Sequence, residues 1–251
     1  MKKEHKFHFL LIVGAMLCLA SALFIIVSEV KENRSYENSK NILLYDGRRI
    51  EDADFSSYRK GTPTPTGEIT DCTYQKQEFI FPTTDTLKEN NITGWVYIDG
   101  IVSEPIMQAE DNAYYLSHSY DGTDSRYGSA FLDCRCMLSD SFLLIYGHNV
   151  KGGQVFGSLK LLRDEERSRL ADARMCFAPD YEIKDYKICI VAIVQETNDI
   201  FALSSIPAQL EANALFTVSE IDSEKQTVLL STCYGNAGTD KRIVIALQED
   251  K

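Results

Sequence analysis

The chain begins with an apolar run, Phe9–Ser28, in which no residue carries a formal charge. An α-helix rises about 1.5 Å per residue, so these twenty residues span about 30 Å, the thickness of the hydrocarbon core of a bilayer. Lysines precede the run and Glu29 follows it, which favours a cytoplasmic N-terminus and an extracellular body. The run exceeds the apolar core of a typical signal peptide, and its small residues Ala20–Ala22 lie inside it. We therefore predict an uncleaved single-pass anchor over residues 1–30, with the transmembrane part at 7–28.

The remaining residues divide by composition into a stalk and a body. Residues 31–75 are largely polar and contain the Pro/Thr segment Gly61–Gly67, which is typical of an extended linker. We interpret them as an extracellular stalk with an N-terminal helical region. Residues 76–251 are long enough for one globular domain. The formal net charge of −11 opposes binding to phosphate backbones, so we expect no nucleic-acid partner.

Short runs of β-branched and aromatic residues, separated by Gly, Asn and Asp, dominate the body. The predicted strands are Gly94–Gly100, Glu104–Gln108, Ser129–Leu132, Phe142–Tyr146, Tyr186–Gln195, Thr227–Thr232 and Arg242–Gln248. Helices are predicted from a cap at Asp85 through Asn91, over Gly157–Ala171, and over Pro207–Phe216 with proline at the first helical position. Many short strands with few helices indicate a mainly β fold, a closed or nearly closed barrel with helical insertions.

Seven cysteines form no regular framework, and their odd number leaves at least one thiol unpaired. In an exported protein, such a thiol indicates reactivity. Cys189 lies in an apolar run and is predicted to be a buried, inert side chain. Cys134 and Cys136 are separated by one residue, whereas cysteine pairs that bind metal usually have two or more residues between them. We therefore predict no metal site.

Three residues suited to acyl transfer stand at the ends of predicted strands. His148 follows the strand Phe142–Tyr146, Cys233 ends the strand that begins at Thr227, and Arg242 opens the last strand. A histidine beside a turn is often structural, and Cys233 alone fits a buried inert thiol equally well. Together the three offer a thiolate nucleophile, an imidazolium that protonates a leaving amine, and a guanidinium that donates to an oxyanion. The set predicts a site for nucleophilic acyl transfer.

Several stretches of the body resemble class B sortases and occur in the order of that family. They are Leu87–Ile98, Asp111–Leu116, Gly128–Asp133, Tyr146–Asn149, Phe156–Leu159 and Leu230–Cys233, the last followed by Arg242. The resemblance covers about residues 79–249. The Leu-Ser-Thr-Cys stretch, with Tyr-Gly-His-Asn upstream, is its most specific part. The family's five-residue signature begins with Thr where this chain has Leu229, which we expect to point outward and to leave the nucleophile unchanged.

The resemblance implies a closed eight-stranded sortase-type β-barrel with helical insertions and an N-terminal helix. It also implies a cysteine transpeptidase at the outer face of a Gram-positive cell membrane. By position, Cys233 would be the nucleophile, His148 the general acid and base, and Arg242 the clamp for the oxyanion and substrate. The implied peptide-contacting residues are Asn112, Leu116, Tyr146 and Ser231.

The implied reaction cleaves a C-terminal sorting motif of a secreted protein after its threonine. The acyl group is held as a thioester and passes to an amine of a peptidoglycan precursor, without a metal or organic cofactor. Three alternatives remain open. A pilin-polymerising sortase would use a pilin lysine as acceptor, a cysteine hydrolase of cell-wall peptides would use water, and a membrane-tethered binding module would perform no chemistry.

Overall fold

The computed structural model of the chain describes residues 2–45, 79–195, 206–235 and 240–250. The chain divides into two compact units at the boundary between Ile80 and Phe81, and each unit is considered by itself. The predicted linker Gly61–Gly67 and Cys72 lie outside the described residues.

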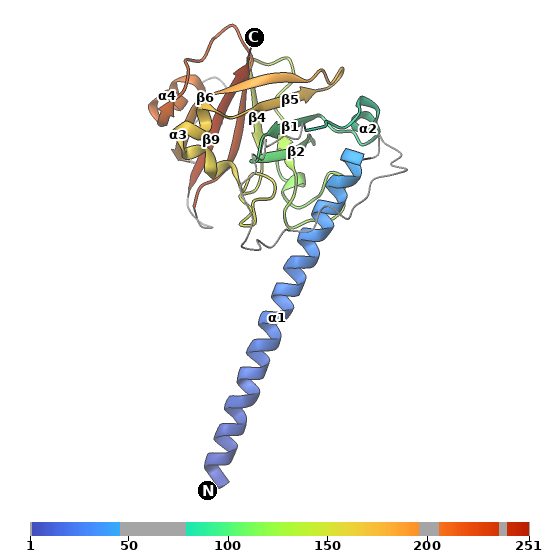
Figure 1. Cartoon of the computed structure of the whole chain (residues 1–251), viewed down its shortest axis with the longest axis vertical. Helices are drawn as coiled ribbons and strands as arrows, with labels where there is room; N and C mark the ends of the chain where they lie inside the picture. Colours follow the sequence, from blue (N-terminus) through green and yellow to red (C-terminus); the bar gives the residue numbers. More distant parts are fainter. Residues whose placement is uncertain (1, 46–78, 196–205, 236–239, 251) are drawn as a thin grey trace, which may run out of the picture. The chain divides into compact units, whose positions relative to one another are not determined.

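The first unit contains the long helix α1 (Lys2–Tyr45), which runs without interruption in Figure 1. Its Gly14–Asn38 part is long and apolar enough to cross a membrane, judged by length and composition. Within this part, the Ser21 and Ser28 hydroxyls each donate to a backbone carbonyl three residues earlier in the helix, at 2.9 Å. The expected N-terminal helix is confirmed, and it continues beyond the predicted anchor into the region interpreted as stalk.

The second unit is built on a closed β-barrel. Its strands are β1 (Gly94–Ile98), β2 (Val102–Met107), β3 (Ala130–Leu132), β4 (Phe142–Tyr146), β5 (Ala173–Phe177), β6 (Lys184–Gln195), β7 (Ala214–Thr217), β8 (Thr227–Cys233) and β9 (Lys241–Glu249). They pair in the order β5-β1-β2-β3-β4-β8-β9-β6-β7, and β5 pairs again with β6. This last pairing closes eight strands into a ring and confirms the predicted fold class. Strand β7 extends the same edge of β6 beyond β5.

The barrel is apolar on both sides of its central strands. Every residue of β8 before Cys233 is buried, and so are all five residues of β1, including the single tryptophan, Trp95. The helices α3 (Glu165–Arg169) and α4 (Ile206–Ala212) lie beside β6 in Figure 1. Leu229, which was expected to point outward, is fully buried. The alternation along β8 separates two faces, but both faces are covered.

Several boundaries differ from those expected. Helix α2 (Thr84–Glu89) is capped by Thr83, whose hydroxyl accepts from the Thr86 amide, whereas Asp85 lies in the first turn.

The helix predicted over Gly157–Ala171 is divided into a 3-10 helix, η3 (Leu159–Arg163), and α3. Asp164 separates them because its extended backbone and its side chain cap α3. The helix predicted over Pro207–Phe216 is shorter in the structure. It corresponds to α4, and the last residues of the predicted range belong to strand β7. A second 3-10 helix, η2 (Tyr114–Leu116), interrupts the loop between β2 and β3.

Candidate active site

Three strand ends meet at one rim of the barrel. Strand β4 runs parallel to β8, with Tyr146 opposite Ser231, so both strands end on the same side. Strand β9 is antiparallel to β8 and begins where β8 ends, with Arg242 directly opposite Cys233. His148 follows the end of β4 by two residues. The topology therefore places the three predicted catalytic residues at one edge.

Two side-chain bonds tie the ends of β4 and β8 together. The buried Thr232 hydroxyl donates to the Gly147 carbonyl at 2.7 Å, and the Asn149 amide donates to the Cys233 carbonyl at 2.9 Å. A β-carbon at Gly147 would lie 2.6 Å from the ring of Phe156, so only glycine fits there without displacing that ring. These contacts fix the backbone on either side of His148 relative to Cys233.

A pocket of about 400 Å³ opens at this rim. Its lining residues are Asn112, Leu116, Phe131, Tyr146, Gly147, His148, Cys233 and Arg242. The structure thus brings together six of the seven predicted site residues. Cys233 is exposed, which excludes the alternative of a sealed, inert thiol. Ser231 is fully buried and is not among the lining residues.

The imidazole of His148 is held by a backbone group. Its Nε2 lies 2.9 Å from the carbonyl oxygen of Leu116, which belongs to the loop between β2 and β3. The Arg242 guanidinium, which also lines the pocket, lies 5.9 Å from the centre of the Tyr146 ring. The Tyr146 ring in turn contacts Phe131, with ring centres 5.4 Å apart.

A buried carboxylate organises the wall formed by Tyr146 and Asn112. The Tyr146 hydroxyl donates to Asp133 Oδ2 at 2.9 Å, and Arg135 donates to both oxygens of the fully buried carboxylate, at 2.9 and 2.7 Å. Burial disfavours the charge of Asp133, but the hydrogen bonds from Arg135, Tyr146 and Asn112 outweigh it and lower the pKa of this carboxyl to about 2. Burial and the Asp133 charge raise the pKa of Tyr146 above its usual range, so its hydroxyl remains a donor.

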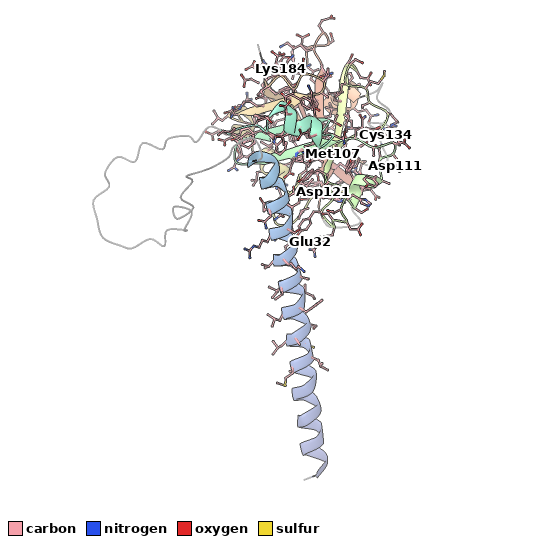
Figure 2. All side chains as sticks on the ribbon, turned by 90° about the vertical axis from the view of Figure 1, so that its right-hand side faces the viewer. Glu32, Met107, Asp111, Asp121, Cys134 and Lys184 are labelled. Carbon is pink, nitrogen blue, oxygen red and sulfur yellow. The ribbon has the colours of Figure 1, made fainter. Side chains whose placement is uncertain are left out.

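Sequence reasoning assigned no role to Asp133 or Asn149, although both lie in or beside the stretches that resemble the family. The sequence does contain a signal for the ion pair of Asp133 and Arg135, because these opposite charges are close together in the chain. The Asn112 side chain also accepts from the Cys134 amide at 2.8 Å, and Figure 2 shows Cys134 and the adjacent Asp111 at the same edge of the unit. Asn112 is therefore held from both sides.

The other described cysteines of this unit differ from Cys233 in environment. Cys136, Cys176 and Cys189 are buried, and burial raises the pKa of each thiol, to about 12 for Cys176. The prediction that Cys189 is a buried side chain is confirmed. Cys134 is half-buried, and Cys136 directs its Sγ to the Phe142 carbonyl at 3.7 Å.

A second cavity, of about 440 Å³, lies at the opposite end of the barrel. Its lining includes Lys184 at the start of β6 and Glu249 at the end of β9, which form an ion pair at 3.1 Å. Figure 2 shows Lys184 at a different edge of the unit from Cys134. None of the predicted site residues lines this cavity.

Comparisons with known proteins agree with this geometry. No family model matches the chain. Sortase B of Listeria monocytogenes is 26% identical over 214 residues, covering 79% of this chain and 80% of the relative. The crystal structure of sortase B from Bacillus anthracis is 28% identical, with a TM-score of 0.54, over 66% of this chain and 82% of that structure.

A Streptococcus pyogenes class B sortase involved in pilus biogenesis has the same fold, with a TM-score of 0.56 and 23% identity. It matches 66% of this chain and 97% of that structure. The similarity to sortase B in sequence and the shared closed barrel indicate a cysteine transpeptidase of class B.

Proposed function

We propose that this transpeptidase is anchored by α1 in the cell membrane and attaches secreted proteins to the cell wall. Cys233 is the nucleophile, His148 the general acid and base, and Arg242 the stabiliser of the oxyanion. The observation that carries the proposal is the solvent-open pocket lined by all three side chains. The substrate is a peptide that ends in a sorting motif.

In the first half-reaction, the Cys233 thiolate attacks the carbonyl carbon of the motif's threonine. The C–O double bond becomes a C–O⁻ single bond, which accepts hydrogen bonds from the Arg242 guanidinium. The C–N bond then breaks, and the protonated His148 gives its proton to the departing amine. The products are a thioester on Cys233 and a released C-terminal peptide.

In the second half-reaction, an amine of a peptidoglycan precursor attacks the thioester. Neutral His148 accepts a proton from this amine, a new amide forms, and the Cys233 thiolate leaves. Because β4 and β9 flank β8 on opposite sides, the acid–base group and the cationic donor approach Cys233 from different strands. This arrangement leaves the pocket between them for the acyl group.

The peptide lies along Asn112, Leu116 and Tyr146 in this proposal, since these residues line the same pocket. Leu116 is exposed and offers an apolar contact, while Asn112 and Tyr146 form the polar wall. Ser231 is buried beneath this surface, so contact with the peptide is assigned to the other three residues.

The N-terminus is cytoplasmic and the catalytic unit extracellular in the proposed topology. The charge difference across the apolar run supports it, as does the substrate, which is exported. An acceptor lysine on a second protein is the second candidate, favoured by the shared fold of the Streptococcus pyogenes class B sortase involved in pilus biogenesis.

The test is cleavage of a pentapeptide library by the full-length enzyme in detergent, with the products identified by mass spectrometry. We expect Cys233→Ala to abolish cleavage, and His148→Ala and Arg242→Ala to reduce it by orders of magnitude. Cys134→Ala is the matched control, because this half-buried thiol lies outside the pocket lining. Normal turnover by Cys233→Ala would overturn the proposal.

The acceptor is tested by adding amines to the preferred peptide. Amide products in excess of hydrolysis are expected with a peptidoglycan-type amine. Hydrolysis alone at saturating amine would instead support a cysteine hydrolase. A pilin lysine as the preferred amine would support the second candidate, and an unchanged cellular phenotype in Cys233→Ala would support a binding module.

A further inference from the structure

The loop between β2 and β3 places a carbonyl oxygen against the imidazole of His148. The oxygen belongs to Leu116, the last residue of η2, and lies 2.9 Å from Nε2. A carbonyl oxygen has lone pairs and no proton, so it accepts a hydrogen bond and never donates one. The hydrogen in this contact therefore belongs to His148 Nε2 in both the neutral and the charged imidazole.

We infer that the Leu116 carbonyl fixes His148 as the Nε2–H tautomer and leaves Nδ1 as the nitrogen that exchanges protons during the reaction. A neutral imidazole carries a single N–H, so holding it at Nε2 leaves the lone pair at Nδ1. When the ring is charged, the proton at Nδ1 is the one available to a leaving amine. This inference rests on the proposed role of His148 and adds a positioning group that acts through its backbone.

The carbonyl is held by a network around Gly128 and Ser129, directly before β3. The Ser129 amide donates to the Tyr115 carbonyl at 2.9 Å, and the Ser129 hydroxyl donates to the His118 carbonyl at 3.1 Å. These two bonds attach the chain on both sides of Leu116 to the entrance of β3. The position of the accepting oxygen is thus set by the barrel rather than by the loop alone.

The start of the loop is fixed as well. Asp111 Oδ1 accepts from the amides of Ala113 and Tyr114, each at 2.8 Å, which orients the first turn of η2. These two amides lower the pKa of Asp111, so its carboxylate stays charged and accepting. Figure 2 shows Asp111 at the edge of the unit.

A side chain added at Gly128 would disturb this network. Its φ of +61° lies in the left-handed region, and a β-carbon would lie 2.3 Å from the Tyr115 carbonyl oxygen and 2.9 Å from the Leu116 oxygen itself. Both neighbours are backbone atoms, so an alanine side chain must displace the segment that accepts from His148. Gly100, with φ +65° and no atom within 4 Å of where a β-carbon would lie, has the same backbone strain without the clash.

The direct test is the tautomer of His148 in the full-length enzyme, measured by NMR of ¹⁵N-labelled histidine at a pH where the ring is neutral. The chain has four histidines, and the His148→Asn spectrum identifies the signal by its loss. We expect a protonated Nε2 and an unprotonated Nδ1. A protonated Nδ1 in the neutral ring would overturn the inference.

The second test compares Gly128→Ala with Gly100→Ala. We expect Gly128→Ala to lower kcat by about ten- to a hundredfold with a smaller change in KM, because a small misplacement of an acid–base group costs rate more than binding. The His148 signal of Gly128→Ala is expected to show a mixture of tautomers, whereas Gly100→Ala keeps both kcat and the wild-type signal. A wild-type kcat and tautomer in a folded Gly128→Ala enzyme would contradict the role of the carbonyl.

The experiments distinguish an error in the proposed acid–base role of His148 from an error in its positioning by Leu116. If His148→Ala retains full activity, the proposed acid–base role is wrong whichever tautomer is found. If His148→Ala is inactive but the neutral ring is protonated at Nδ1, the proposed function stands and the positioning by Leu116 is wrong. Should Gly128→Ala not fold, the tautomer of the wild-type enzyme still decides the inference.

Discussion

The substitution Asp133→Asn tests whether a buried carboxylate holds one wall of the pocket. In the native protein the carboxylate accepts from Arg135 and Tyr146, and its pKa is lowered from 3.8 to about 2. A difference of that size corresponds to about 2 kcal/mol in favour of the ionised form in the folded state. An amide at this position also turns donors toward Arg135, so we expect Asp133→Asn to lower the free energy of unfolding by about 2–4 kcal/mol.

The stability difference between the wild-type protein and Asp133→Asn is also expected to depend on pH. The pKa of Asp133 is lower in the folded protein than in the unfolded chain, so its stabilisation is fully present above about pH 4. It is lost as the pH falls through about 2, where the folded protein also binds the proton. The difference in unfolding free energy between the wild-type protein and Asp133→Asn therefore narrows between about pH 4 and pH 2.

The assay is urea unfolding of the full-length protein in detergent, followed by the fluorescence of Trp95, the single and fully buried tryptophan. Asp185→Asn on β6 is the matched control, because this carboxylate is exposed and its loss is expected to change stability by less than about 0.5 kcal/mol. The reasoning would be refuted if, at pH 7, Asp133→Asn lowered the free energy of unfolding no more than the control does. It would also be refuted if the loss of unfolding free energy were equal at pH 2 and pH 7. Peptide KM is expected to rise as well, since Tyr146 loses its acceptor.

Three further predictions follow from the same geometry. Thr232→Val leaves the buried Gly147 carbonyl without its hydroxyl donor, so we expect a loss of about 1–3 kcal/mol in urea unfolding and a lower kcat. Iodoacetamide is expected to modify Cys233 in the native protein while Cys176 reacts only after unfolding, as peptide mapping by mass spectrometry will show. Deletion of residues 1–30 is expected to give a soluble enzyme with the full-length kcat; a folded but inactive product would show that the anchor does more than tether.

Much of the barrel was predictable because its strands alternate or form short apolar runs between turn residues. Strand β5 was missed because Ala173–Phe177 has no clear alternation and is defined by its partners β1 and β6, which are distant in sequence. Strand β7 was missed because its apolar residues continue the pattern of α4. The burial of Leu229 was not predictable, since a period of two separates two faces of a strand but does not say whether the outer face is covered.

The placement of the pocket residues was predictable where it depends on a residue standing at a strand end. Cys233, His148 and Arg242 meet as expected because parallel and antiparallel neighbours of β8 end or begin at one rim. The contributions of Asp133 and of the Leu116 carbonyl were not predictable in the same way. One depends on a buried charge that collects several donors, and the other on a backbone atom whose position no residue type specifies.

The bond between the Asn149 amide and the Cys233 carbonyl joins residues 84 positions apart. Such a bond forms only after β4 and β8 have come together, and β8 and β9 are the last strands of the barrel to be synthesised. A chain that has been synthesised only as far as His148 does not yet contain Cys233, which lies at the end of β8. The pocket lined by His148 and Cys233 is therefore complete only when the C-terminal strands have joined the barrel.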